Sequence, residues 1–303
     1  MIVSASYKTD IPAFYAEWFR RRLRAGFARM TNPYSGQVHE VDLSPAGCDG
    51  FVFWTRNALP FLDTLAEAQA RGFPFIVQYT VTGYPRALEA SVVAAEHSLK
   101  AMHELARTYG QEAVVWRYDP VMLTSLTPPD WHRVNFARLA RELRGACDEV
   151  VFSFAHIYDK TRRNTDRAAA RHGFSWWNPA DGEKIGLLEE LAGIAAEEGF
   201  TPTLCAQPQL LREPLFTPLS AARCIDAGRL SRVAGREIAA PTKGNRPGCL
   251  CARARDIGAY DTCPHGCVYC YAVQRPDTAK HRYRKHDPES EFLVTPGRGV
   301  EKA

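Results

Sequence analysis

The amino-acid sequence predicts an α/β protein built on a parallel (β/α) barrel, full or partial. Short apolar runs rich in β-branched and aromatic residues alternate along the chain with longer amphipathic segments. Strands that alternate with helices form βαβ units and therefore a parallel sheet. The chain has 303 residues, of which 46% are hydrophobic and 24% charged, as in ordinary soluble domains. An open doubly wound sheet is the alternative, because a sequence does not show whether a sheet closes.

Six apolar runs are predicted as strands, and a seventh candidate lies near the C-terminus. Each run contains Val, Ile, Phe, Tyr, Trp or Thr and is bounded by turn-forming residues. The predicted strands are residues 2–6, 51–55, 73–80, 113–119, 149–154 and 200–206, with 256–260 (DIGAY) as the seventh.

Four segments between these runs have the spacing of amphipathic helices, namely residues 11–26, 87–110, 127–145 and 182–199. Asp10 can cap the first helix, and Gly26 and Gly110 stand where the first two end. We therefore divide the chain into a barrel body, a cluster-binding segment that completes the barrel, and a polar, basic extension at the surface. These parts comprise residues 1–240, 241–275 and 276–303.

The positive charge of the chain is concentrated at its C-terminal end. Residues 241–303 hold 11 Lys and Arg against 7 Asp and Glu, which accounts for the whole net charge of +4. The run KHRYRKH (280–286) is interpreted either as a grip on nucleic-acid phosphates or as a solvated extension. No apolar run reaches the 18 or so residues of a membrane span, and the N-terminus lacks a signal-peptide pattern, so we expect a cytoplasmic protein without membrane contact.

The distribution of the nine cysteines indicates a metal centre. Cys48 and Cys147 have no neighbouring thiol and are expected to be buried and inert, whereas the other seven fall in the last third of the chain. Three of these, Cys263, Cys267 and Cys270, have the spacing CxxxCxxC. A structural zinc site normally takes four ligands. Three cysteines on an iron–sulfur cluster leave one iron without a protein ligand, where a cofactor or substrate can bind.

The segment CPHGCVYC, residues 263–270, resembles the radical S-adenosylmethionine (SAM) signature, in which an aromatic residue precedes the third cysteine as Tyr269 does here. The resemblance implies a 4Fe–4S cluster on Cys263, Cys267 and Cys270 whose free iron binds SAM. It further implies reductive cleavage of SAM to a 5′-deoxyadenosyl radical, hydrogen abstraction from a substrate, and an electron donor such as a flavodoxin or ferredoxin. Tyr269 is then expected beside the adenine or the cluster.

The chain as a whole resembles a bacterial family of uncharacterised-domain proteins that carry this motif at the C-terminus, and it is distantly similar to spore photoproduct lyase. The matching segments are FWTRN, VVWRYDP, SFAHIYDK, CxC and DIGAYDTCPHGCVYCYA. Radical SAM proteins typically carry the motif after their first strand, whereas here it follows the last. A circular permutation would account for this late position. If DIGAY pairs with IVSAS (2–6), the motif loop emerges at the same edge of the sheet as the loops after the other parallel strands.

The remaining cysteines are Cys205, Cys224, Cys249 and Cys251. Together they can ligate a second iron–sulfur cluster or a zinc ion, which would join the C-terminal segment to the barrel. The alternative is that Cys205 and Cys224 are buried core thiols.

Polar residues at the ends of predicted strands are candidates for contacts to SAM. They are Asn57, Gln78, Thr80, Arg117, Asp119 and Ser153. The Arg117 guanidinium suits a carboxylate, either that of SAM or that of Asp119, and Asp119 or Asn57 suits ribose hydroxyls. Each of these side chains is equally able to cap a helix or satisfy a loop.

The leading prediction is a radical SAM-type enzyme whose substrate is unknown, with a nucleic acid or nucleotide as one candidate. The first alternative is a non-catalytic nucleic-acid-binding module stabilised by zinc or an iron–sulfur cluster. The second is an electron-transfer or redox-sensing protein whose cluster has four protein ligands.

Overall fold

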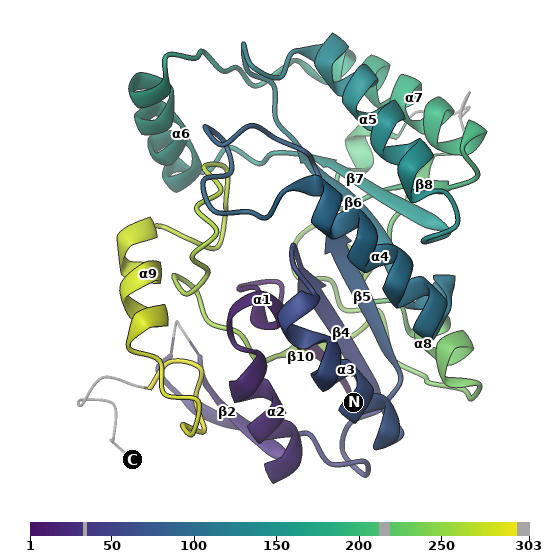
Figure 1. Ribbon diagram of the computed structural model, residues 1–303, viewed down its shortest axis with the longest axis vertical. Helices are drawn as coiled ribbons and strands as arrows, with labels where there is room; N and C mark the ends of the chain where they lie inside the picture. The colour runs from purple at the N-terminus through teal and green to yellow at the C-terminus, as the bar shows by residue number, and fades with distance from the viewer. Residues whose placement is uncertain (33–34, 212–218, 296–303) are drawn as a thin grey trace.

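The computed structural model describes residues 1–32, 35–211 and 219–295 and has an α/β fold with one large parallel sheet (Figure 1). Eight strands lie in the order β10-β1-β4-β5-β6-β7-β8-β9, and every neighbouring pair is parallel. They are β1 (Ile2–Ala5), β4 (Gly50–Thr55), β5 (Phe75–Thr80), β6 (Val114–Val121), β7 (Glu149–Phe154), β8 (Thr201–Leu204), β9 (Ser220–Ala221) and β10 (Ala254–Asp256).

The parallel sheet confirms the predicted α/β class, but the sheet does not close into a complete barrel. Strands β10 and β9 are its two edges, and no pairing joins them within the described ranges. The strand order still runs in one direction from β1 to β9, without the reversal that defines a doubly wound sheet. The fold is thus an open sheet with the sequential winding of a partial barrel.

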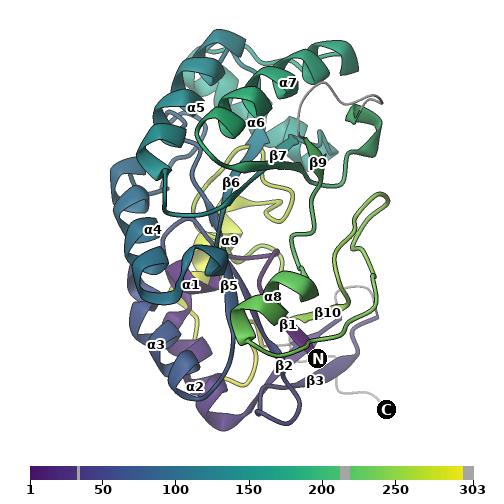
Figure 2. The ribbon, with the colours of Figure 1, turned by 90° about the vertical axis from the view of Figure 1, so that its right-hand side faces the viewer.

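Helices cover one face of this sheet, and an irregular C-terminal segment with one short helix covers the other. Figure 2 shows α2, α3, α4, α5 and α7 on one side of the strands and α8 on the opposite side. The helices are α1 (Ile11–Phe14), α2 (Ala16–Ala25), α3 (Leu62–Ala70), α4 (Ala95–Tyr109), α5 (Pro129–Leu143), α6 (Asp159–His172), α7 (Asp181–Glu197), α8 (Ala227–Ala234) and α9 (Pro276–Arg284). A separate antiparallel hairpin consists of β2 (Phe27–Thr31) and β3 (Val38–Asp42).

The two faces of the sheet have separate apolar cores because successive side chains of a strand point to opposite sides. On the helix-covered face, Phe51 and Phe53 of β4 pack edge-on against Phe19 of α2. On the opposite face, Val52 lies with Ile2 of β1 and with residues of the segment from 222 to 252. That segment therefore fills the face that a closed barrel would enclose.

Two of the predicted helices differ in extent from the helices in the structure. The helix expected over 11–26 is interrupted at Tyr15, although Asp10 caps it by accepting a hydrogen bond from the Ala13 N–H (2.9 Å) and it ends at Gly26 as predicted. The helix expected over 87–110 begins only at Ala95. Tertiary contacts of Leu88 and Glu89, described below, take the place of the missing helical turns.

The C-terminal extension is more ordered than the sequence indicated. Helix α9 lies within it, and Tyr283 packs edge-on against Phe14 and Tyr15, with ring centroids 5.4 and 5.7 Å apart. These contacts engage Tyr283, the one tyrosine of the KHRYRKH run, of which 41% remains exposed. Residues 296–303 of the predicted extension lie outside the described residues.

The prediction that the C-terminal strand lies beside the first strand is confirmed. Strand β10 pairs in parallel with β1, Asp256 lies opposite Ser4, and the Ile257 N–H donates to the Ser4 carbonyl (3.1 Å). The strand itself ends at Asp256, so it overlaps only the beginning of DIGAY. The sequence FARMT (27–31), the helix α6 and the two-residue strand β9 were not predicted.

Asp256 fastens the junction of β10 and β1. Its carboxylate accepts hydrogen bonds from the hydroxyls of Ser4 and Ser6 (both 2.8 Å) and from the Tyr7 N–H (3.0 Å), and the Lys8 ammonium lies 3.5 Å away. The chain approaches so closely here that a Cβ at Gly258 would lie 1.9 Å from the Ser6 hydroxyl oxygen. The carboxylate thus holds the end of β10 against the turn that follows β1.

We predict that Asp256→Ala lowers the free energy of unfolding by about 3–5 kcal/mol, because it leaves a buried ammonium without its partner. Asp226→Ala is the matched control, since Asp226 caps α8 at the surface through the Gly228 N–H (2.8 Å) and its loss costs about 1 kcal/mol. Urea unfolding measures both, and equal destabilisation by the two substitutions would contradict the assigned role of Asp256.

A second prediction concerns His132 of α5, which is fully buried between the Tyr118 hydroxyl (2.9 Å) and the Met122 carbonyl (3.2 Å). Burial lowers the pKa of His132 to about 4, so the unfolded chain binds a proton more tightly than the folded chain does. Neutral, buried His132 therefore contributes fully to the free energy of unfolding above about pH 6.5. About 3 kcal/mol of that free energy is lost as the pH falls from there through 4.

The measurement is the free energy of unfolding between pH 7 and pH 4, compared for the unmodified chain, His132→Gln and the exposed-site control His103→Gln. We expect the pH dependence to be smaller in His132→Gln and unchanged in the control. Parallel profiles for all three proteins would exclude His132 as the source.

Candidate functional site

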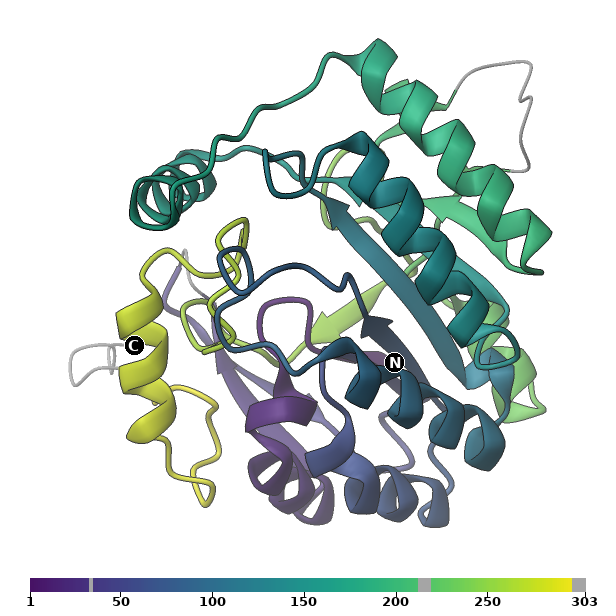
Figure 3. The ribbon, with the colours of Figure 1, turned by 45° about the horizontal axis from the view of Figure 1, so that its top comes forward.

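A cavity of about 370 Å³ lies at the edge of the sheet where the strands end. Its walls come from the segments that follow β1, β4, β6, β7 and β8, and from the chain on both sides of β10. Figure 3 shows the loop after β10 on the side to which the strand arrowheads point. All seven cysteines of the last third of the chain line this one cavity. Cys48 and Cys147 do not, and both are buried elsewhere, as predicted.

The three cysteines of the CPHGCVYC loop surround part of the cavity. Backbone N–H groups point at two of the sulfurs: Ala272 donates to Cys270 Sγ (3.4 Å), and His265 donates to Cys263. No sulfur–sulfur hydrogen bond joins the three within the described part of the chain, and none is in a disulfide. Burial raises the pKa of each thiol, so these cysteines are neutral at neutral pH unless a cation stabilises their thiolates.

The cysteine loop is attached to the loop that follows β5 by backbone pairing. The Val268 N–H donates to the Leu88 carbonyl (3.0 Å), the Ser91 N–H donates to the His265 carbonyl (2.8 Å), and Glu89 forms an isolated antiparallel bridge with Cys267. This pairing explains why residues 87–94 do not continue helix α4. On its other side the loop ends against α6, where the Asn164 amide donates to the Val273 carbonyl (3.3 Å).

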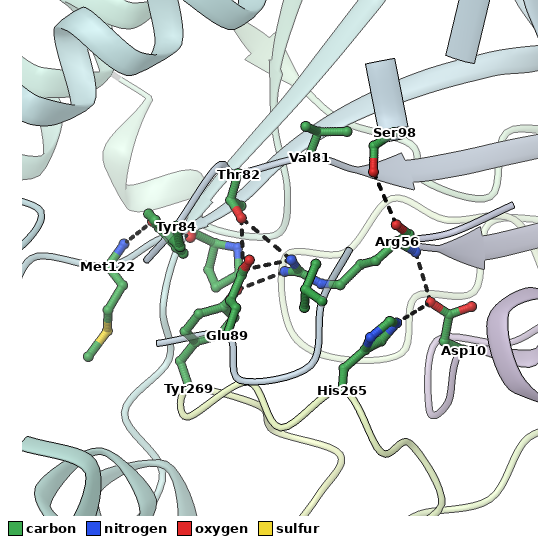
Figure 4. Close-up of polar contacts among 12 residues, drawn as sticks. Asp10, Arg56, Val81, Thr82, Tyr84, Glu89, Ser98, Met122, His265 and Tyr269 are labelled. Atoms are coloured by element: carbon green, nitrogen blue, oxygen red, sulfur yellow. Dashed lines mark hydrogen bonds and ion pairs between the residues drawn. The ribbon is translucent and has the colours of Figure 1, made fainter. Parts of the chain in front are cut away.

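A buried ion pair holds the tyrosine of the motif (Figure 4). The Arg56 guanidinium donates to Glu89 Oε1 (2.6 Å) and to the Tyr269 hydroxyl (2.8 Å), while Thr82 and Tyr269 donate to the same carboxylate oxygen. A lone buried guanidinium or carboxylate would be costly, and the pair with its added hydrogen bonds satisfies both. Tyr269 therefore serves first to orient the cysteine loop.

His265, between the first two cysteines, is fixed from the opposite side. Its Nε2 lies 2.8 Å from Asp10 Oδ2, and the Arg56 N–H donates to the same oxygen (2.8 Å), as Figure 4 shows. Asp10 thereby joins the loop after β1, the end of β4 and the cysteine loop. Its other oxygen is the cap of α1.

The second cysteine set also comes together. Cys224 donates to Cys205 Sγ (3.4 Å), and Cys251 lies within hydrogen-bonding reach of both Cys224 and Cys249. The hydrogen bond with Cys224 and burial raise the pKa of Cys205. The hydrogen bond with Cys251 lowers the pKa of Cys249 to about 6. The four cysteines of the predicted second site therefore line one cavity, and Cys205 and Cys224 are also buried, as in the core alternative.

No group of three or more His, Cys, Asp or Glu side chains is arranged to hold a metal ion within residues 1–32, 35–211 and 219–295. In the second set the Cys224 thiol donates to Cys205, and no sulfur–sulfur hydrogen bond joins the cysteines of the first set within these residues. The structure thus brings candidate ligands to one cavity without itself showing a metal centre.

Five of the seven residues predicted to contact SAM line the cavity: Thr80, Arg117, Asp119, Ser153 and Tyr269. The Arg117 guanidinium is already occupied, because its Nε donates to Asp119 Oδ2 (2.9 Å) and its Nη1 to Gln78 Oε1 (3.0 Å) and Cys224 Sγ (3.1 Å). Ser153 donates to the second oxygen of Asp119. Of the two carboxylates considered for Arg117, the structure provides that of Asp119.

The structure does not bring Asn57 or Gln78 to the cavity. The Asn57 side chain accepts a hydrogen bond from the Leu59 N–H (3.2 Å) and shapes the turn after β4. Gln78 is buried and donates to the Cys224 carbonyl (2.9 Å), so it positions the second cysteine set rather than a ligand. Both have the local roles that were the alternative to ligand binding.

Comparison with known protein families gives one match. Residues 2–272 match the profile of a family described as a domain of unknown function, DUF1848. The chain belongs to this family. No curated protein and no solved structure matches the chain significantly, so neither comparison supports or tests the similarity to radical SAM proteins or to spore photoproduct lyase. Both cysteine sets fall inside the matched residues of this DUF1848 chain, whereas α9 lies beyond them.

Several cavity residues of this DUF1848 chain were missed from the sequence. Tyr7 and Lys8 follow β1 directly, so the rule that selected the other strand ends applies to them as well. Arg246, Tyr260 and Tyr271 lie in loops, and no pattern in the sequence marks them as neighbours of the cysteines. No helix in the described part of the chain is long and apolar enough to span a membrane.

We predict that Tyr269→Phe lowers the free energy of unfolding by about 1.5–3 kcal/mol, since it removes a hydrogen bond to a buried carboxylate. Tyr283→Phe is the control, because that ring packs at the surface against Phe14, and its change should stay within about 0.5 kcal/mol. Thermal and urea unfolding report both values. A neutral Tyr269→Phe substitution would show that the hydroxyl does not hold the loop.

Proposed function

We propose that this protein is a radical SAM-type enzyme in which Cys263, Cys267 and Cys270 hold a 4Fe–4S cluster. The observation that carries the proposal is the position of the three thiols. They line a cavity at the carboxyl edge of a parallel sheet, directly after the strand that pairs with β1. This is the edge at which parallel-sheet enzymes of the barrel type build their sites.

The donor set fits a cluster with three protein ligands. The three thiols face the same cavity, none is in a disulfide, and backbone N–H groups already point at two of the sulfurs. N–H···S hydrogen bonds of this kind tune cluster potentials. Bound there, the cluster would supply the electron that cleaves SAM, with one iron left for the amino and carboxylate groups of the cofactor.

The protein's own contribution is to hold this loop rigidly. The backbone bonds of Val268 and Ser91, the Arg56–Glu89 pair and the Asp10–His265 contact fix it from three directions. A reactive site gains from such support, since small displacements of positioned groups cost large factors in rate. Tyr269 acts here as a positioning residue, because its hydroxyl is used by Glu89 and Arg56.

Contacts to SAM would come from the polar wall provided by β5, β6 and β7. Thr80, Asp119 and Ser153 line the cavity there, and Asp119 is oriented by Arg117. A carboxylate oriented in this way can accept hydrogen bonds from ribose hydroxyls, whereas the Arg117 guanidinium is already engaged by Asp119, Gln78 and Cys224. The aromatic rings of Tyr7, Tyr260 and Tyr271 line the same cavity and would limit the access of water.

The test is to purify the protein without oxygen, reconstitute it with iron and sulfide, and measure 5′-deoxyadenosine formed from SAM under a strong reductant. We expect about four irons on the first cysteine set and turnover of SAM. The triple variant Cys263→Ala, Cys267→Ala, Cys270→Ala should form no 5′-deoxyadenosine, and the double variant Cys48→Ala, Cys147→Ala should form as much as the unmodified protein.

Undiminished 5′-deoxyadenosine from the triple variant would disprove the proposal. A second readout separates the alternatives: adding SAM should change the electron paramagnetic resonance signal of the reduced cluster. A cluster with four protein ligands would give no such change, and a protein that binds only zinc would give no signal.

A further inference from the structure

The four cysteines outside the CPHGCVYC loop gather from three separate parts of the chain. Cys205 follows β8, Cys224 follows β9, and Cys249 and Cys251 precede β10. Strands β9 and β10 are opposite edges of the open sheet. The thiols meet on the face without the main helix layer, where Cys205, Cys224 and Cys251 pack with Ile2 and Val52.

Two of these sulfurs are in contact, since Cys205 Sγ and Cys224 Sγ are 3.4 Å apart. Cys249 and Cys251 line the same cavity as this pair. A tetrahedral ion with metal–sulfur bonds of about 2.3 Å requires neighbouring sulfurs about 3.8 Å apart. The measured separation of one pair is close to that value. It is much longer than the bond of about 2.0 Å in a disulfide.

Hydrogen-bond donors surround these sulfurs. The Arg117 guanidinium donates to Cys224 Sγ (3.1 Å), the Ile225 N–H to Cys251 Sγ (3.3 Å), and the Arg246 guanidinium to Cys205 Sγ (3.6 Å). Four thiolates around a divalent ion carry a net charge of −2, which Arg246 and Arg117 would offset only in part, because Arg117 is also paired with Asp119. Donors that orient metal ligands in this way are usual around metal sites.

We propose that Cys205, Cys224, Cys249 and Cys251 bind one Zn²⁺ ion in a tetrahedral site that joins the two edges of the open sheet. The proposal is independent of the function proposed above and concerns a different set of ligands. A single ion is favoured over a second cluster because the Cys205 and Cys224 sulfurs are only 3.4 Å apart, as two ligands of one ion are, whereas the cysteines of a cluster bind different irons and lie farther apart. On binding, four metal–sulfur bonds replace the S–H···S contacts, and the thiol protons pass to solvent.

The structural consequence is a closure that the strands do not provide. The residues between β9 and β10 cross the face opposite the main helix layer and carry the chain from one edge of the sheet to the other. With an ion bound, Cys205 and Cys224 at one edge would be linked directly to Cys249 and Cys251, which lie five and three residues before β10. The position of β10, and of the cysteine loop after it, would then depend on the metal.

The first test is the metal content of the full chain expressed with zinc in the medium. We expect about one zinc per chain in the unmodified protein and in the triple variant of Cys263, Cys267 and Cys270. The double variant Cys249→Ser, Cys251→Ser should lose at least about nine-tenths of it, while the control Cys48→Ala, Cys147→Ala keeps it. X-ray absorption at the zinc edge should show four sulfur neighbours.

The second test uses the unmodified folded protein, so it does not depend on whether a variant folds. Titration with an organomercurial should release one zinc per chain, and Co²⁺ in its place should give the visible spectrum of a tetrahedral thiolate site. Any of three results would overturn the proposal: folded protein without zinc, about eight irons per chain, or zinc that is lost from the triple variant instead of the double variant.

Discussion

The architecture depends on the parallel pairing of the last strand with the first. Strand β10 is only three residues long, too short to be held by its ladder hydrogen bonds alone. The Asp256 carboxylate supplies what the ladder lacks, because it accepts bonds from Ser4, Ser6 and the Tyr7 N–H and pairs with Lys8. The cysteine loop starts from this junction, and the Arg56–Glu89 pair and Asp10 then hold it in place.

The cavity is built from buried charges, and each is matched locally. Arg56 pairs with Glu89, Arg117 with Asp119, and Lys8 with Asp256, while Asp10 is hydrogen-bonded to His265. Such pairs contribute little net stability, since desolvation offsets much of their attraction, but removing one partner is expensive. They therefore specify geometry: Arg56 and Asp10 hold the cysteine loop, whereas Arg117 connects the polar wall to Cys224.

The strands of the sheet could be predicted from the sequence because buried parallel strands are continuous apolar runs. Helix α6 could not, since its buried residues include Thr161, Asn164 and Thr165, which give no apolar periodicity. The start of helix α4 was misplaced for a different reason: residues 87–94 have helical spacing, but Glu89 gains a buried partner by leaving the helix. At the cavity, the rule of strand ends found Asp119 and Ser153 and failed for Asn57, because it locates a residue without giving the direction of its side chain.

The sequential strand order explains why a cluster loop can stand at the end of the chain. In a sheet wound in one direction, a strand placed before β1 occupies the same position whether it comes first or last in the sequence. When that strand comes last, as β10 does, no short connection links it to its neighbour β1. The residues between β9 and β10 must then carry the chain from one edge of the sheet to the other. Ordering that long connection costs conformational entropy, and contacts that the connection itself makes must offset this cost. Cys224, Cys249 and Cys251 all lie within it, close to its two ends, which is where cross-links restrict such a segment most.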